Sequence, residues 1–112
     1  MENITVSISG KQYVIEEPNM KKIIKYEKLM YKAEQEYEFD KFDLKELKAK
    51  ANSFYSLTSF SDEISNDFAQ FDFGTLPLMA SEEFINEYLD KVMPWYYDNL
   101  AKIQEAALAK KQ

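Results

Sequence analysis

The chain has 112 residues, the size of one globular domain, with 20 acidic residues, 14 lysines, no arginine and a net charge of −6. This balance disfavours nucleic-acid binding, which needs basic residues to neutralise phosphates, and the absence of histidine and cysteine removes ordinary zinc sites and the usual catalytic triads. Because no apolar run approaches the ~20 residues that span a bilayer, and neither cysteine nor a signal-peptide pattern is present, we expect a cytoplasmic protein that does not enter a membrane.

Residues 3–16 predict a β-hairpin. Apolar residues alternate with threonine and serine over 4–9, the period-two pattern of a half-buried strand. Gly10 supplies the backbone freedom of a tight turn, and β-favouring residues resume at 13–15, before Pro18 closes the segment. A lone hairpin is marginally stable in water, so its apolar face must lie on the following helices or pair with another chain.

Residues 19–37 predict an amphipathic helix with two opposite faces. The apolar stripe consists of Ile23, Tyr26, Met30, Ala33 and Tyr37. Nearly opposite lies a stripe of lysines, Lys21, Lys25, Lys28 and Lys32. Two interpretations of the lysines stay open: a solvated face whose stems cover apolar area, or a docking surface for an acidic partner or an anionic membrane.

The next helix is predicted from a local start signal. Asp43 and Glu46 have the spacing of a capping box, and Phe42 with Leu47 has the spacing of a hydrophobic staple, so the helix is expected to start at Leu44. The side chains expected on its buried stripe are Leu44, Leu47, Ala51, Phe54 and Thr58.

Three further helix starts are predicted. Ser61 and Ser81 are each followed by two acidic residues, a pattern typical of the first turn of a helix. Pro94 must kink or end the second of these helices and is expected to be the first residue of a final helix, which runs through Tyr96, Leu100 and Ile103. The prediction is a single α+β domain over 1–112, predominantly α, with a hairpin at 3–16 and about five helices within 19–110.

Few residues in the sequence can carry chemistry. Glu63 and Asp67 share a helix face at i, i+4, where they can form an acid/base pair, bind a hard cation, or simply be solvated. Nothing nearby in the sequence supplies a third ligand. We therefore expect no enzyme, no catalytic residue, no metal and no cofactor.

The aromatic residues favour a binding function. Eight Phe, eight Tyr and one Trp are more than a core of this size needs, and tyrosine and tryptophan are favoured anchors in protein interfaces. The alternative is that a loosely layered helical domain buries most of them. The residues predicted to bind a partner are Phe71, Phe73, Trp95, Tyr96 and Tyr97.

The hairpin Ile4-Thr-Val-Ser-Ile-Ser-Gly10-Lys-Gln-Tyr-Val-Ile15, followed by Pro18, an amphipathic helix and acidic helices, resembles the tail assembly chaperones of long-tailed bacteriophages. The resemblance is one of architecture over the whole chain, without a diagnostic motif. Members of that family are commonly made in two lengths through a ribosomal frameshift, and the terminal Ala109-Lys110-Lys111 can be encoded by a slippery heptamer.

The resemblance implies a function without catalysis. Such a chaperone coats the tape measure protein, a long, helical and aggregation-prone client, until tube subunits polymerise around it. It implies self-association along the client, action in the host cytoplasm and absence from the mature virion. Exposed aromatic surface and a net acidic exterior suit this function.

Two other classes of function stay open. One is an acidic phage-encoded inhibitor of a host defence nuclease, acting by protein binding or by nucleic-acid mimicry. Mimicry needs a continuous array of carboxylates, whereas acids and lysines are interleaved here, most densely over 40–50. The other is an enzyme that uses carboxylates and tyrosines, for which the sequence offers no convergent set of residues.

Overall fold

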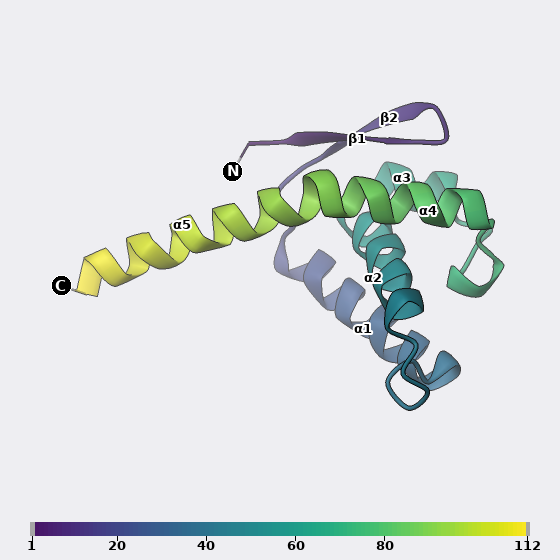
Figure 1. Cartoon of the computed structure of the whole chain (residues 1–112). Helices are drawn as coiled ribbons and strands as arrows, with labels where there is room; N and C mark the ends of the chain where they lie inside the picture. The colour runs from purple at the N-terminus through teal and green to yellow at the C-terminus, as the bar shows by residue number, and fades with distance from the viewer. Residues whose placement is uncertain (1, 112) are drawn as a thin grey trace.

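The computed structural model describes the backbone of residues 2–111 and their side chains except at 103, 110 and 111. It confirms the predicted α+β, mostly α fold, with an N-terminal hairpin followed by helices (Figure 1). The elements in chain order are β1 (Ile4–Ile8), β2 (Lys11–Ile15), α1 (Met20–Tyr37), α2 (Lys45–Phe60), α3 (Asp62–Asp67), the 3-10 turn η1 (Phe73–Thr75), α4 (Leu78–Glu87), the π-helical turn η2 (Tyr88–Val92) and α5 (Met93–Lys111).

The hairpin forms as the sequence predicts. Its two strands pair antiparallel, with Ile8 opposite Lys11, and the two turn residues Ser9 and Gly10 have φ of 52° and 78°. Positive φ at both central positions is the requirement of a type I′ turn, which matches the twist of the flanking strands. One face is fully buried, with Val6, Ile8 and Ile15 at 0% exposure, because the hairpin lies across α4 and the helices below it (Figure 1).

Helix α2 is the centre of the molecule. It packs between α1 and α4 (Figure 1), and every residue over 53–60 is buried. Three of these are serines, Ser53, Ser56 and Ser59, whose small side chains let the neighbouring helices approach closely on more than one face. The hydroxyl of Ser53 donates to the carbonyl of Ala49, which satisfies this polar group within the helix.

Helix α1 has the two faces expected. Its apolar stripe packs against the core, with Ala33 buried and Tyr26 and Met30 partly so. The four lysines of the opposite face are exposed.

The capping box predicted for the start of α2 does not form. Asp43 has φ of 55°, the left-handed region, so its carboxylate does not cap the helix, which begins at Lys45 without a side-chain cap. Leu47, expected in the buried stripe, is 43% exposed, because the first turns of α2 lie outside the packed centre, whereas Ala51, Phe54 and Thr58 are buried as predicted. By contrast, Ser61 caps α3 as expected, accepting from the N–H of Ile64.

The serine at 81 does not start a helix. Helix α4 begins at Leu78, directly after Pro77, and Ser81 is buried inside it. A proline at the start of a helix loses no hydrogen bond, because the first N–H groups of a helix have no partner within it. Helix α4 therefore starts after Pro77 and not at Ser81.

Pro94 does not end the helix before it. Helix α4, η2 and α5 form one continuous rod, and Met93 is helical with φ of −62° and ψ of −49°. In the π-helical turn the N–H of Met93 donates to the carbonyl of Tyr88, five residues back instead of four. This wider turn accommodates Pro94 within the helix. Proline has no N–H for the regular hydrogen-bond pattern, and its ring would clash with the preceding turn of a regular α-helix.

Beyond this turn, α5 leaves the body of the protein (Figure 1). Its free part accounts for a long dimension of 49 Å and a radius of gyration of 15.0 Å, compared with about 13 Å for a compact chain of this length. The chain therefore combines a packed body with a projecting helix.

Candidate protein-binding groove

A hollow of about 310 Å³ lies at the base of the projecting helix, between α1, α2, η2 and α5. We call it the basal groove. Its lining residues are mostly aromatic or aliphatic: Ile23, Tyr26, Glu27, Ser56, Phe60, Tyr88, Val92, Tyr96, Tyr97 and Leu100. They come from four elements, so the groove exists only in the folded protein.

The groove is apolar with hydroxyl groups placed around it. The hydroxyl of Tyr26 bonds to the side-chain oxygen of Asn52, on the α2 side of the groove. Burial, and then the neighbouring Tyr88, raise the pKa of Tyr26 to about 12, and burial also raises the pKa of Tyr88. Both phenols are therefore neutral at physiological pH. Among the lining residues, Glu27 is the one charged side chain.

The apolar surface continues from the groove along α5. Leu100 lines the groove and is half-buried, whereas Leu108, two turns further on, is 62% exposed. At 100° per residue, Tyr97 and Leu108 differ by about 20° around the helix axis, and Leu100 and Ala107 differ by a similar angle. These four residues thus lie within about 100° of one another around α5, with Gln104 between the two pairs. We call the four residues the α5 stripe.

Two of the five predicted binding residues lie in the basal groove. Tyr96 stacks on Phe60, with ring centroids 6.2 Å apart, and packs edge-on against Tyr97 at 5.6 Å. Tyr97 is 56% exposed. The structure therefore places Tyr96 as part of the wall and Tyr97 as part of the accessible rim.

The other three predicted residues lie elsewhere. Phe73 packs against Tyr37 and Phe39, and Phe71 lies beside Phe68, so both are partly buried among other rings. Trp95 packs against the core and donates its indole N–H to the carbonyl of Glu2, below the hairpin. The structure does not bring these three together with Tyr96 and Tyr97.

Several groove residues were not among the predicted binding residues, although the sequence contains a signal for some of them. Ile23 and Tyr26 belong to the predicted apolar stripe of α1, and Leu100 to that of the last helix. Tyr88 belongs to the apolar face that the sequence predicts for the helix after Ser81, whereas Phe60 had no such signal. They meet the others only because the π-helical turn carries α5 past the end of α2.

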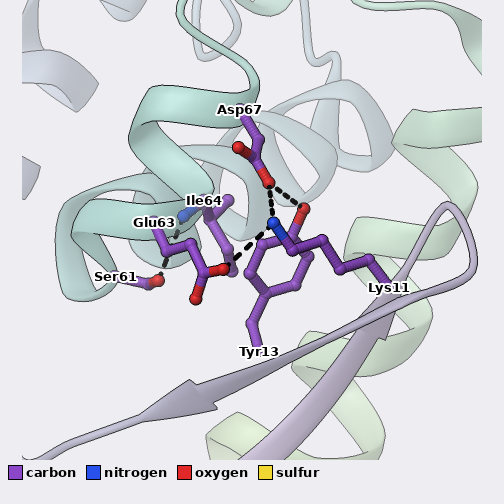
Figure 2. Close-up of polar contacts among 6 residues, drawn as sticks. All are labelled: Lys11, Tyr13, Ser61, Glu63, Ile64 and Asp67. Atoms are coloured by element: carbon purple, nitrogen blue, oxygen red, sulfur yellow. Dashed lines mark hydrogen bonds and ion pairs between the residues drawn. The ribbon is translucent and has the colours of Figure 1, made fainter.

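The carboxylate pair singled out from the sequence holds a lysine. Figure 2 shows the ammonium of Lys11 between Glu63 and Asp67, at 3.0 and 2.9 Å, and the hydroxyl of Tyr13 donating to Asp67 at 2.7 Å. The pKa of Asp67 is lowered, mainly by the hydrogen bond from Lys11 and next by that from Tyr13. The pKa of Tyr13 is raised to about 12, mainly by burial and next by its hydrogen bond to Asp67. These groups fasten β2 to α3, and we call them the hairpin clamp.

Within the described side chains, no three histidine, cysteine, aspartate or glutamate residues gather in a way that would hold a metal ion. None of the described helices has the length and apolar character needed to cross a membrane. The arrangement of the basal groove and the α5 stripe is one that can bind an apolar surface of another chain, with Glu27 available to a basic group.

The chain matches no protein-family model, no curated protein and no solved structure. Its function must therefore be inferred from the groove and from the sequence.

Proposed function

We propose that this protein is a phage tail assembly chaperone that binds and solubilises the tape measure protein and catalyses no reaction. It acts in the host cytoplasm, associates with further copies of itself along the client and is left out of the finished virion. One observation supports this most strongly: the basal groove is lined mostly by aromatic and aliphatic side chains, and the exposed Tyr97 and Leu108 continue apolar surface from it along α5.

The shape of this surface suits a helix. Stable monomers seldom expose a long apolar stripe, and a projecting helix of this length is marginally stable in water without a partner. A second amphipathic helix laid along α5 would cover the stripe with residues at i, i+3, i+4 and i+7, and would place one end in the groove. The helical client implied by the family resemblance has this chemistry.

The rim of the groove suits repeated, reversible binding. Tyr97 offers a large, stiff ring with a polar tip, which buries much area at little cost in side-chain entropy. Glu27 can pair with a lysine or arginine of the client.

The nuclease inhibitor is the second candidate, and the surface charges do not favour it. Many of the described carboxylates are paired with lysines, which breaks up a continuous negative stripe. These pairs are Glu63 and Asp67 with Lys11, Glu38 with Lys41, Asp43 with Lys45, Asp40 with Lys48, Glu82 with Lys50 and Glu87 with Lys91.

The test is co-expression with the tape measure protein of the same genome, followed by measurement of how much client is soluble and co-purifies. We expect the client to be soluble only when this chain is present. Tyr97→Ala and Leu100→Ala each remove apolar surface from the groove and should reduce the co-purified client at least ten-fold.

Tyr31→Ala is the matched control, because Tyr31 is also an exposed tyrosine, at 67% compared with 56% for Tyr97, and does not line the groove. It should leave the yield of client unchanged. The proposal is wrong if the client stays insoluble with the wild-type chain, or if Tyr97→Ala and Tyr31→Ala behave alike.

A further inference from the structure

The two outer edges of the hairpin differ. The N–H of Ser7 on β1 donates to Glu87 at 3.0 Å, and the N–H of Ser9 in the turn donates to Glu83 at 2.7 Å. Both carboxylates come from α4. The edge of β1 is therefore closed by side chains of the same molecule, a common way to keep an exposed strand from pairing with another chain.

The edge of β2 is open. Hydrogen-bonded and non-hydrogen-bonded pairs alternate along an antiparallel ladder, and Ile8 opposite Lys11 closes the two-residue turn with a hydrogen-bonded pair. Gln12 and Val14 are then in non-hydrogen-bonded pairs, so their N–H groups point away from β1. Over residues 2–111, no acceptor from the chain meets either N–H, and both residues are exposed.

A hollow of about 180 Å³ lies beside this open edge, between β2 and the corner where α2 meets α3. Val14 and Phe60 provide its apolar part. A strand that paired with β2 could therefore place one of its side chains in this hollow. In strand addition the backbone hydrogen bonds give affinity, and such side-chain pockets give specificity.

The charge of the hollow favours one charge on the side chains of an added strand. Three carboxylates line it, those of Glu16, Asp62 and Glu63, with one lysine, Lys22. Glu63 is paired with Lys11 in the hairpin clamp, so Glu16 and Asp62 are the carboxylates that can meet a basic side chain. The ammonium of Lys22 is directed inward, donating to the carbonyl of Phe60 at 3.1 Å. An incoming segment with lysine or arginine therefore meets an excess of negative charge, whereas an acidic segment is repelled.

We infer that the edge of β2 and the adjoining hollow bind an extended, basic segment of a partner protein, which adds as a third strand to the hairpin. The partner's backbone pairs with Gln12 and Val14, and its lysine or arginine side chains face Glu16 and Asp62. This site is separate from the basal groove, which takes a helix. The two sets of lining residues share Phe60 alone, so either site can exist without the other.

The probe is a capped synthetic peptide in which lysine alternates with valine and threonine. Two matched peptides serve as controls: one has glutamate for lysine, and one carries N-methyl groups on the residues that would pair with β2. Binding is followed by amide chemical shifts of the full chain at low and at physiological salt.

We expect saturable shifts centred on Gln12, Val14 and Ser61 with the basic peptide, weakening as salt rises. Affinity should fall at least ten-fold for the N-methylated peptide and for the glutamate peptide. Shifts centred elsewhere, equal binding of the glutamate peptide, or no saturable binding would overturn the proposal. So would the same shifts on raising the protein concentration alone, because the occupant would then be a second copy of the chain.

Variants of the protein test the same edge. Val14→Pro removes the outward N–H and should lower the affinity at least ten-fold, whereas Val14→Thr keeps this N–H and a β-branched side chain and should lower the affinity much less. Asp62→Asn together with Glu16→Gln should weaken binding several-fold and reduce its salt dependence. If Val14→Pro fails to fold, the N-methylated peptide still decides the question, because it alters the partner and not the protein.

Discussion

Helices α2 and α5 differ in how their composition relates to their environment. Helix α2 contains three serines and a threonine, yet its second half is buried on all sides. Helix α5 carries tyrosines, leucines and alanines, yet beyond its base it extends into solvent. The comparison teaches that residue type alone does not identify the core of this protein. Small residues allow close packing in α2, while apolar ones remain available for a partner in α5.

The largest difference expected between the two helices is in hydrogen exchange. Amides over 53–60 of α2 should exchange only on global unfolding, which costs about 5–15 kcal/mol for a domain. Amides of α5 beyond Leu100 should exchange with little protection, because few contacts hold that part of the helix to the body. Native-state exchange measured by NMR checks this. Equal protection in the two helices would show that α5 packs on the body in solution.

The next largest effect is expected from a cavity in α2. Leu57 is 0% exposed at the centre of the core, and Leu57→Ala should lower the free energy of unfolding by about 2–5 kcal/mol, because it removes apolar burial and leaves a cavity. Urea unfolding followed by circular dichroism measures the change. A loss below about 1 kcal/mol would mean that α2 is not the centre of the packing.

A smaller, pH-dependent effect is expected at the hairpin clamp. The pKa of Asp67 is lowered in the fold, so its contribution to stability is present above the ordinary aspartate pKa and is lost as the pH falls through the lowered value. Asp67→Asn should be less stable than the wild type at neutral pH and should lose less stability on acidification. Urea unfolding across the acidic range tests this, and superimposable pH profiles would contradict it.

The same variant should change the titration of Tyr13. The raised pKa of Tyr13, about 12, means that its neutral form is favoured by folding, so this contribution is lost as the pH rises toward that value. Removing the carboxylate of Asp67 should lower the Tyr13 pKa only in part, because burial is the larger cause. Ultraviolet titration, with Tyr13→Phe to identify the signal, measures the shift. Glu63→Gln, which leaves the Asp67–Tyr13 bond in place, is the control.

The smallest effect is expected on the exposed helix. Leu108→Ala in α5 makes the same chemical change as Leu57→Ala but at 62% exposure, so the free energy of unfolding should change by no more than about 0.5 kcal/mol. If the α5 stripe binds the client, this variant should still lower the yield of co-purified tape measure protein. A loss of stability as large as that of Leu57→Ala would place Leu108 in a core.

The candidate site was only partly predictable. Local patterns identified the hairpin and the apolar stripe of α1, and they marked Tyr96 and Tyr97 as binding residues, both of which line the basal groove. They also marked Phe71, Phe73 and Trp95, which the structure places away from that groove. Periodicity shows which residues share a face of one helix, but not which faces of different helices meet.

The sequence by itself determined the elements whose signals are local. The alternation before Gly10 specifies a strand and a turn, and Ser61 with its acidic neighbours specifies the start of α3, because these patterns act within a few residues. It also determined the absence of the ordinary catalytic and zinc-binding residue sets, since histidine and cysteine are lacking.

Only the tertiary structure decided the rest. Pro94 predicts a kink or an end, but a π-helical turn continues the helix into α5, whose first turns form the basal groove with α1 and α2. Asp43 predicts a cap, but the path of the α1–α2 loop holds it in the left-handed region. Lys11, Glu63 and Asp67 are distant in sequence, and only the fold makes them one clamp. Local preferences of about 1 kcal/mol did not decide the conformation at Asp43 or Pro94, and they carry no information about which remote residues meet in the clamp.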